Sequence, residues 1–387
     1  MPGSGKTSLL IKEMQKENNY SYMYITPFLK EVERVKKECN NRKFYEPDAQ
    51  KGKGKKLNDM HNLLMNEKNI VSTHALFKNS NELTRELIKA GNYILVLDEV
   101  MDVIEQVQLN KDDLKLLLDK EMIKVENNMI IWNDNTEYDD TKYNDIKEMA
   151  KNNTLFMVNN IVLIWTFPIN IFECFKEVYI LTYMFDGQIQ KYYFDLYNIE
   201  YEYYHVEKQN NEYLKIDGKI KEEKNFKINI IENDKINNIG DDRYTLSVSW
   251  FMKNRDTSLM DKMKNNLLNW FKNKNKANSN EIIWTTFKTY KSKLQGKGYT
   301  KGFLSVNARA TNEYRNRMYL AYCANIFLNP LVKLFFTQNG IKVNEDVYAL
   351  SEMLQWIFRS AIRDGKEIWI YIPSSRQRQL LIDWLED

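Results

Sequence analysis

The chain has 387 residues, enough for two or three domains that each bury a core of their own. Its 56 basic and 53 acidic side chains leave a net charge of +3, which excludes a protein that binds nucleic acid through strong overall charge. Three widely spaced cysteines argue against a disulfide framework or a zinc cluster, and the interrupted apolar stretch at residues 161–185 against a membrane span. With no signal-peptide pattern, we expect a cytoplasmic protein without membrane contact, or one in the host cytoplasm if its source is viral.

The first half alternates strand-like and helix-like segments. A glycine-rich loop at residues 2–7 opens an amphipathic helix. Further along the chain, strands are predicted at residues 20–26, 69–73, 93–97 and 176–182, a helix at residues 29–39, and an exposed basic loop at residues 51–56. The 93–97 run is apolar throughout, as expected of a strand that is buried on both faces. Residues 110–155 are charged and asparagine-rich without a sustained period, and we predict a helical insertion there.

The second half follows a polar connector at residues 205–243, whose short alternating patches predict a hairpin. From residue 244 onward the pattern predicts strands at 244–250, 281–285 and 367–372, and helices at 259–272 and 350–362. Alternating strands and helices favour parallel sheets. The predicted fold class is therefore α/β, with two lobes of mainly parallel sheet at residues 1–204 and 244–387.

The glycine-rich loop has the composition of a phosphate-binding loop. Glycines let main-chain N–H groups turn toward phosphate oxygens, and the helix that follows adds its positive N-terminal end. In such a loop Lys6 reaches the β- and γ-phosphates and the Thr7 hydroxyl is a Mg²⁺ ligand. The loop predicts ATP and Mg²⁺ as ligands, and we assign nucleotide binding to Gly3, Ser4, Gly5, Lys6, Thr7 and Ser8.

The start of the chain cuts this pattern short. The full pattern is G-x-x-x-x-G-K-[ST], and its first glycine would fall one residue before Met1. A P-loop also follows a strand, which we expect to lie in the middle of the sheet and which this sequence does not contain. We expect that the natural product begins upstream, and that the 387-residue form is less stable and binds ATP poorly.

A second motif, the acidic pair Asp98-Glu99, follows the apolar run at residues 93–97. Asp98 and Glu99 stand where a parallel strand would deliver them beside the phosphate-binding loop. Asp98 is expected to hold Mg²⁺ together with Thr7, while Glu99 polarises the attacking water. The P-loop about 90 residues upstream makes this pair far more specific than an isolated Asp-Glu.

Near the end of the chain, Gln355, Arg359 and Arg363 are spaced four residues apart. On the predicted helix they share one face, beside an apolar stripe that would pack on the lobe. Two guanidiniums on that face would point to the cleft and stabilise charge on a γ-phosphate. The alternative is a solvated basic face on a core helix.

A basic segment at residues 288–301 interleaves lysines with two tyrosines. Lys291, Lys293 and Lys297 would neutralise phosphates, and Tyr290 and Tyr299 would stack on bases, unless the run is merely a solvated loop. The nearby Arg309, Arg315 and Arg317 add positive charge to the same region.

Taken in order, these segments resemble the superfamily 2 helicases, and among them small phage-type proteins of the DEAD/DEAH kind. Residues 25–27 resemble motif Ia and residues 72–74 the later strand-to-loop contact of the first lobe. Residues 181–183, Leu-Thr-Tyr, occupy the position of the family's Ser-Ala-Thr motif. Of the three residues, only Thr182 is of a type found in that motif. Residues 284–287, 307–312 and 355–363 resemble motifs IV, V and VI. Phe358 replaces a family glycine, and the second arginine comes one position late.

The resemblance implies two RecA-like lobes with ATP in the cleft between them. It assigns catalysis to Lys6, Asp98, Glu99, Gln355, Arg359 and Arg363, and nucleic-acid contact to Thr26, Thr73, Lys291, Lys293, Lys297 and Arg309. Arg359 is the matching position for the arginine finger, with Arg363 open as the alternative. The implied activity is that of an ATP-hydrolysing helicase or translocase in phage DNA replication or recombination, with DNA favoured over RNA.

Two other functions stay open at this point. A P-loop kinase for a small molecule or nucleotide would share the first motif, but it does not explain a second lobe that ends in Gln355, Arg359 and Arg363. A non-catalytic nucleic-acid-binding protein with a degenerate P-loop would explain the shortened loop and the altered Ser-Ala-Thr.

Overall fold

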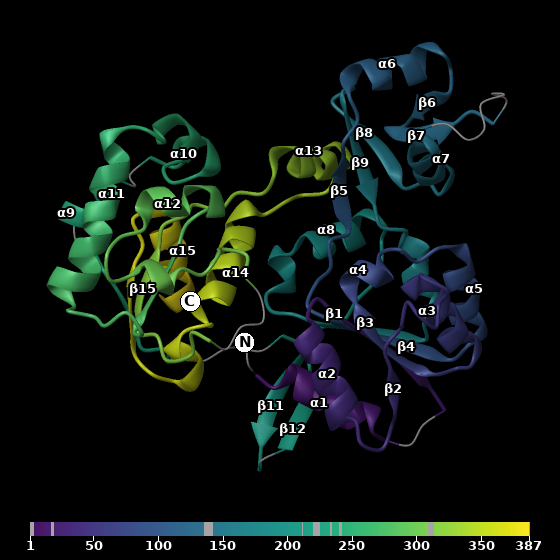
Figure 1. Ribbon diagram of the computed structural model, residues 1–387, viewed down its shortest axis with the longest axis horizontal. Coiled ribbons are helices and arrows are strands. Elements are labelled where there is room, and N and C mark those ends of the chain that lie inside the picture. The colour runs from purple at the N-terminus through teal and green to yellow at the C-terminus, as the bar shows by residue number, and fades with distance from the viewer. Residues whose placement is uncertain are drawn as a thin grey trace.

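A computed structural model describes residues 4–16, 19–134, 142–210, 212–219, 225–232, 234–239, 242–308 and 313–386. Gly3 and Arg309, two residues with predicted roles, lie outside these ranges. The chain forms two α/β lobes and a smaller body that projects from the first lobe (Figure 1). Among the described residues, none of the helices has the length and apolar character needed to cross a membrane.

The first lobe is built on five parallel strands in the order β10-β4-β1-β3-β2. Their bounds are β1 (Ser21–Thr26), β2 (Phe44–Tyr45), β3 (Asn69–Thr73), β4 (Tyr93–Asp98) and β10 (Glu177–Leu181). Each strand predicted for the first half is thus confirmed. We expected a missing strand in the middle of this sheet, and that expectation is wrong. Because β4 pairs directly with both β1 and β10, the free edge lies at β10.

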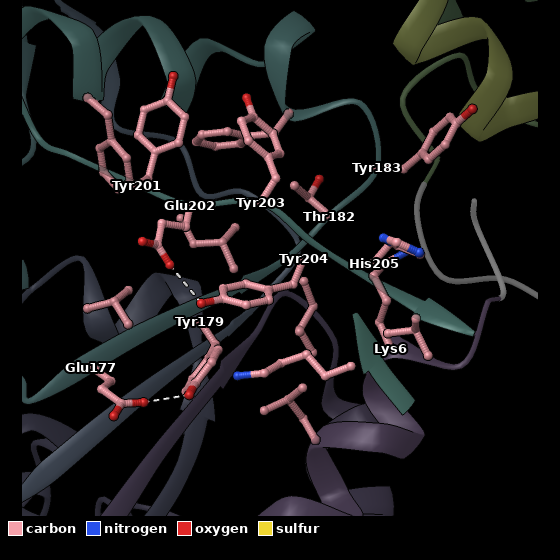
Figure 2. Close-up of a pocket in the computed structure, with 18 of the residues that line it drawn as sticks. Lys6, Glu177, Tyr179, Thr182, Tyr183, Tyr201, Glu202, Tyr203, Tyr204 and His205 are labelled. Carbon is pink, nitrogen blue, oxygen red and sulfur yellow. Dashed lines mark hydrogen bonds between the residues drawn. The ribbon is translucent and has the colours of Figure 1, made fainter. Parts of the chain in front are cut away.

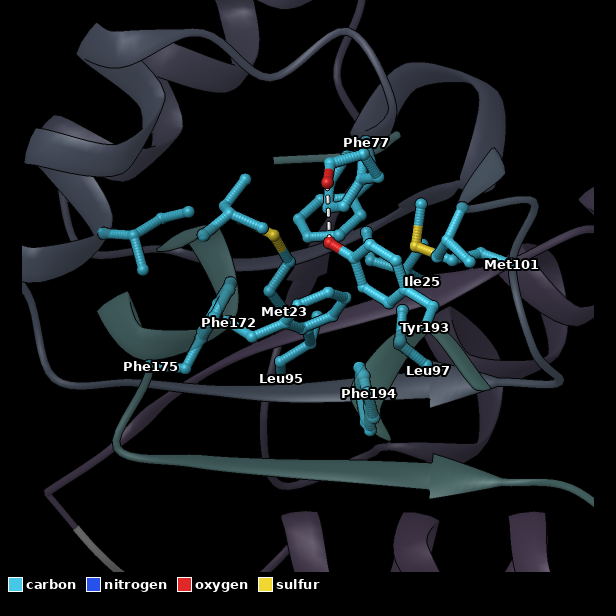
Figure 3. Packing of buried hydrophobic residues seen from close by; sticks show 14 of the residues in the cluster. Met23, Ile25, Phe77, Leu95, Leu97, Met101, Phe172, Phe175, Tyr193 and Phe194 are labelled. Atoms are coloured by element: carbon cyan, nitrogen blue, oxygen red, sulfur yellow. Dashed lines mark hydrogen bonds between the residues drawn. The ribbon is translucent and has the colours of Figure 1, made fainter. Parts of the chain in front are cut away.

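Side chains alternate between the two faces of this sheet and build a core on each. Met23, Ile25 and Leu95 point to one core, where Figure 3 shows them packed among aromatic rings. Tyr24 and Val96 point to the other. The helices of the lobe are α1 (Lys6–Met14), α2 (Leu29–Glu38), α3 (Lys56–Met65), α4 (His74–Phe77), α5 (Glu82–Ala90) and α8 (Ile189–Leu196), with short 3-10 turns η1 (Ile169–Cys174) and η2 (Phe185–Gly187).

The insertion is not the helical excursion predicted for residues 110–155. It is a five-stranded antiparallel sheet, β5-β9-β8-β7-β6, that spans residues 104–166 and carries two helices. Asn127 and Asn128, both with positive φ, form the two-residue turn between β6 and β7. The elements are β5 (Ile104–Val107), α6 (Lys111–Asp119), β6 (Ile123–Glu126), β7 (Met129–Trp132), α7 (Asn144–Lys151), β8 (Leu155–Val158) and β9 (Val162–Thr166).

The predicted connector contains the expected hairpin, β11 (Tyr204–Gln209) and β12 (Glu212–Asp217). The second lobe begins earlier than residue 244, because β13 (Ile228–Ile230) pairs with β16 (Ile368–Tyr371) in its sheet. The strand predicted at 244–250 is wrong. The Ser247 hydroxyl accepts a hydrogen bond from the Trp250 main chain and caps α10 (Val248–Asn254) instead.

The second sheet has four parallel strands in the order β13-β16-β15-β14. Strand β15 (Tyr319–Tyr322) lies inside the sheet and β14 (Ile282–Thr285) at one edge, and β14 confirms the strand predicted at 281–285. The strand predicted at 367–372 is β16. The remaining elements are α9 (Asp234–Asn237), α11 (Ser258–Leu268), the π-helical η3 (Asn269–Lys274), η4 (Lys288–Tyr290), α12 (Lys291–Leu294), η5 (Thr300–Gly302), α13 (Pro330–Gln338), α14 (Glu345–Ile357), η6 (Ala361–Asp364) and α15 (Ser375–Glu386).

The two lobes pack on each other through α13 and α14. Phe335 of α13 lies edge-on to Phe156 of the insertion, with ring centroids 5.3 Å apart, and both belong to the core of the first lobe. On α14, Ser351 accepts a buried hydrogen bond of 3.0 Å from the Gln188 side chain, just after η2. In Figure 1 α13 stands between the second lobe and the insertion.

Candidate functional site

The glycine-rich loop, expected to bind phosphates, and the start of α1 lie at the carboxyl edge of the first sheet, beside the end of β4. Gly5 caps α1 with a φ of +89°, a conformation that side-chain-bearing residues rarely adopt. The Lys6 ammonium donates to the Ser4 hydroxyl over 3.3 Å, so it folds back over the loop. A Cβ on Gly5 would lie 2.2 Å from the Tyr213 ring, which shows that the β11–β12 hairpin covers this loop.

Asp98 lies at the carboxyl end of β4, beside the start of α1. Its Oδ1 accepts a hydrogen bond from the Thr7 hydroxyl and its Oδ2 one from the Thr26 hydroxyl, each 3.3 Å long. Burial, followed by the charges of Glu99 and Glu31, raises the pKa of the Asp98 carboxyl to about 6. The predicted meeting of the Thr7 hydroxyl and the Asp98 carboxylate is confirmed, and both oxygens are of the kind that Mg²⁺ takes.

Glu99 has a φ of +68°, a left-handed conformation that costs a residue with a side chain about 1–3 kcal/mol. Its main-chain N–H donates to the Leu181 carbonyl over 3.1 Å, which ties the end of β4 to the end of β10. The next residue, Thr182, has a buried hydroxyl that finds no hydrogen-bond partner among the described residues. A main-chain hydrogen bond thus joins the Asp98-Glu99 motif directly to residues 181–183, the position of the altered Ser-Ala-Thr motif.

The α2 helix contributes charged groups that the sequence pattern did not single out. Arg34 donates from Nη2 to the Ser8 hydroxyl over 3.0 Å, and it pairs with Glu31 and Glu38 at 3.2 and 3.0 Å. The charge of Glu31 also acts on Asp98. Lysines, arginines and glutamates along a helix usually mark a solvated face, so only the fold shows that this face borders the site.

The predicted helix at residues 350–362 ends early, and Gln355, Arg359 and Arg363 do not share one helix face. The last residue of α14 is Ile357, and the Ser360 hydroxyl donates to the Ile357 carbonyl in the turn that follows. Gln355 stays on α14 and is buried, Arg359 lies in the turn, and Arg363 lies in η6.

Charged residues of the first lobe act on Arg363. Burial and the neighbouring Arg315 guanidinium lower the pKa of Arg363, while the charges of Asp364 and of Glu31 act in the opposite sense. Arg34 also acts on it. Glu31 and Arg34 both belong to α2, and Arg34 donates to Ser8, so the charges that act on Arg363 include residues close to the start of α1.

The predicted nucleic-acid contacts divide into exposed and buried groups. Thr26 is fully buried and its hydroxyl donates a hydrogen bond to Asp98. Its side chain is therefore not available to a nucleic-acid strand at the surface. Thr73 caps α4 by accepting from the Leu76 main chain. The expected stacking of Tyr290 and Tyr299 on bases is wrong, since Tyr290 stacks on Phe251 and Tyr299 is fully buried.

The three lysines of the basic segment have separate environments. Lys293 pairs with Asp256 at 2.7 Å, and Lys291 lies over the Phe303 ring at 4.8 Å from its centroid. Lys297 is exposed in the turn before Tyr299. All three side chains remain at the surface of the second lobe, where added phosphates would reach them.

A cavity of about 1730 Å³ opens beside the phosphate-binding loop. One wall is β10, and another is the chain from Tyr201 to His205 that leads into β11 (Figure 2). Ser4 and Lys6 line its end nearest the loop. Among the described residues, no cluster of three or more histidine, cysteine or acidic side chains is placed to hold a metal ion.

Comparison with known proteins places the chain in a family. Residues 222–385 match the family described as the YonV C-terminal Rossmann-like domain, and residues 104–165 the YonV middle domain. The SPbeta prophage-derived uncharacterized protein YonV of Bacillus subtilis (strain 168) is 49% identical over 401 residues, covering 100% of this chain and 97% of that protein. The chain belongs to the YonV family.

The YonV domain limits agree with the structure. The middle domain coincides with the antiparallel insertion, and the C-terminal domain takes in β13, in line with the early start of the second lobe. Two solved structures are similar over most of the chain. One is an XPD helicase (TM-score 0.42, 11% identity, 98% of this chain and 93% of that one), and the other is Xpd4 of S. tokodaii (0.44, 10%, 98% and 91%).

Proposed function

We propose that this protein is a nucleic-acid-dependent ATPase that works as a helicase or translocase. The observation that carries the proposal is the meeting of Thr7 with Asp98 at one sheet edge, opposed by Arg363 of the second lobe. A phosphate loop, an acidic pair and an arginine from a second lobe are the parts that phosphoryl transfer to water requires. The two α/β lobes supply them from opposite sides.

Each residue has a role that follows from its position. The Gly5 loop and Lys6 would bind the β- and γ-phosphates of ATP, with Ser4 and Ser8 alongside. Thr7 and Asp98 would hold Mg²⁺, which supplies charge neutralisation at the phosphates when bound. Glu99 would orient and polarise the attacking water from the end of β4, where its main chain has a positive φ. Arg363 would stabilise charge on the departing γ-phosphoryl group.

Nucleic acid would run over the exposed surface of both lobes. Lys291, Lys293 and Lys297 offer positive charge on the second lobe, and the Thr73 region offers a strand end on the first. We favour DNA as the substrate and a role in phage replication or recombination in the host cytoplasm, because the B. subtilis relative is prophage-derived.

Measuring ATP turnover with and without single-stranded DNA tests this proposal. We expect turnover that rises when DNA is added and that is lost in Lys6→Ala. A kinase would instead move the γ-phosphate to a small acceptor, independently of DNA. Tight DNA binding with no turnover under any condition would favour the non-catalytic alternative and overturn the ATPase proposal.

A further inference from the structure

The β11–β12 hairpin pairs with neither lobe's sheet, so its position depends on what it packs against. A two-stranded hairpin is marginally stable at best on its own. Val206 and Tyr213 share one face of it, because Tyr213 lies opposite Lys208, two residues after Val206. Both side chains pack on the core that contains Leu9 and Leu10 of α1. This face of the hairpin is therefore turned toward the start of α1 (Figure 1).

The Tyr213 ring lies directly on the glycine-rich loop. A Cβ added to Gly5 would come within 2.2 Å of Cε1 of this ring and within 2.6 Å of Cδ1 and Cζ. Gly5 has a φ of +89°, and its carbonyl accepts a hydrogen bond of 2.8 Å from the Leu9 amide in the first turn of α1. Glycine has more conformational freedom than any other residue, so a loop built on it keeps one shape only where its surroundings restrict it. The ring supplies such a restriction.

Asp186 of η2 contacts the chain at both ends of the hairpin. Its Oδ1 accepts a hydrogen bond of 2.7 Å from the Tyr203 hydroxyl, just before β11, and its Oδ2 one of 2.5 Å from the Lys219 ammonium, just after β12. The Lys219 ammonium also lies 4.2 Å from the centroid of the Tyr203 ring. The next residue, Gly187, packs on the Val347 main chain of the second lobe. One carboxylate thus joins the two stems of the hairpin at a place that also meets the second lobe.

We propose that Tyr213 is a positioning residue for the phosphate-binding loop and that Asp186 keeps it in place by holding both stems of the hairpin. As far as it concerns ATP, this inference rests on the proposed function. A loop that is held in its binding shape before the ligand arrives loses less conformational freedom on binding, so its affinity is higher. The ring would tighten ATP binding while it takes no part in the chemistry.

The alternative is a ring that blocks the phosphate site. Tyr213 packs with Leu9 and Leu10, which are core residues of α1. The groups proposed to meet Mg²⁺, the Thr7 hydroxyl and the Asp98 carboxylate, hydrogen-bond to each other at the end of β4. The ring therefore contacts the loop from the side of the α1 core, which favours support of the loop over blockage.

Amide hydrogen exchange in the nucleotide-free chain tests the positioning without ATP. We expect Tyr213→Ala to accelerate exchange at Leu9, whose amide donates to the Gly5 carbonyl, by about tenfold or more. Exchange at the buried strand β4 should stay unchanged, which shows that the lobe remains folded. Asp186→Ala should act in the same direction. The double variant should exchange no faster than Tyr213→Ala, because both changes remove the same support.

ATP binding and turnover give a second readout. Tyr213→Ala should raise the Kd of a fluorescent ATP analogue and the KM by about tenfold, with kcat unchanged, because the ring contacts no reacting group. Tyr213→Phe keeps the ring and should restore native behaviour in both experiments. Glu212→Gln is the matched control on the same strand. It removes only an exposed ion pair with Lys12, and we expect neither exchange nor binding to change.

The two readouts separate this inference from the proposed function. Unchanged exchange at Leu9 in Tyr213→Ala would overturn the positioning role, whatever the ATPase activity proves to be. Tighter ATP binding in Tyr213→Ala would identify a blocking ring and would overturn it as well. If the native chain binds no ATP, the proposed function fails, and the exchange result alone decides whether Tyr213 holds the loop.

Discussion

Glu99 combines a predicted catalytic role with a backbone conformation that the sequence pattern does not reveal. Its positive φ and its hydrogen bond to the Leu181 carbonyl fix the carboxylate relative to β10. Strain of this kind persists where the surroundings determine the backbone, and it is concentrated at functional sites. The conformation therefore supports the role proposed for Glu99.

Glu99→Gln should abolish ATP hydrolysis while ATP binding stays close to that of the unmodified protein, because only the water contact changes. Lys6→Ala should abolish hydrolysis and also weaken ATP binding, because it removes a charge from the phosphates. Turnover and equilibrium binding of a fluorescent ATP analogue separate the two effects. Undiminished turnover in Glu99→Gln would show that another group activates the water.

Asp98 predicts a pH dependence of stability. Its pKa of about 6, against a usual 3.8, means that the folded protein holds the neutral acid better than the unfolded chain does. This contribution is complete below pH 3.8 and is lost as the pH rises through 6, by about 3 kcal/mol in all. Asp98→Asn, which stays neutral, should therefore gain stability relative to the native chain between pH 4 and pH 7. Urea unfolding at both pH values measures this, and a constant difference would contradict it.

At the residue scale, the sequence sufficed to place Thr7 beside Asp98, because loop and strand motifs carry their own geometry. It did not suffice for Arg34, whose role depends on which helix face meets the site. Thr26 was assigned to nucleic acid because residues 25–27 resemble motif Ia. Only the register of β1 beside β4 turns its hydroxyl toward Asp98.

At the element scale, turns account for most of the differences from the sequence prediction. Asn127-Asn128 closes a hairpin inside an asparagine-rich stretch that was predicted to be a helical insertion. The turn at Ser360 likewise ends α14 where the apolar spacing continued the helix. The sequence located the long buried strands well, because a strand that is buried on both faces is an unbroken apolar run.

The early end of α14 changes the expected ranking of the two arginines. We now expect Arg363→Ala to slow ATP hydrolysis by roughly 10³–10⁵ with little change in ATP binding. Arg359→Ala should have the smaller effect, and Arg255→Ala, at an exposed position, none. Single-turnover kinetics measure all three. Normal hydrolysis in both Arg359→Ala and Arg363→Ala would remove the arginine finger from the mechanism.

The contact between η2 and α14 predicts a second effect. A Cβ on Gly187 would lie 2.6 Å from the Val347 carbonyl oxygen, so Gly187→Ala must push the two lobes apart locally. We expect a loss of about 1–3 kcal/mol in stability and weaker stimulation of turnover by DNA. Thermal unfolding measures the first effect and ATPase assays the second. Ser292→Ala, at an exposed position of α12, is the control, and identical melting of both variants would contradict the close packing.

At the scale of the whole molecule, the net charge of +3 is too small to attract nucleic acid by itself. DNA binding would therefore depend on where the basic residues lie on the surface. Replacing Lys291, Lys293 and Lys297 together with alanine should weaken DNA binding and lower the slope of log affinity against log salt by up to about 3. Replacing the exposed Lys111, Lys115 and Lys120 of the insertion is the matched control. An unchanged slope in the first variant would move the DNA path elsewhere.

The two-lobed α/β organisation could be predicted from sequence because strand and helix periods alternate along both halves. The boundary at residue 244 could not, since the three residues of β13 carry little pattern and are defined only by pairing with β16, far away in the chain. The architecture of the insertion was hidden for a similar reason, because its strands are four or five residues long.

The position of α13 constrains how the molecule can move. The chain links the lobes once through the hairpin region. Phe335 and Phe336 link them a second time, by packing against Phe156 of the insertion and Tyr192 of α8. The Gln188–Ser351 hydrogen bond and the close packing of Gly187 on Val347 join the lobes at a further place, through α14. A movement that separates the lobes therefore has to break the aromatic contacts of α13 and the contacts of α14 together.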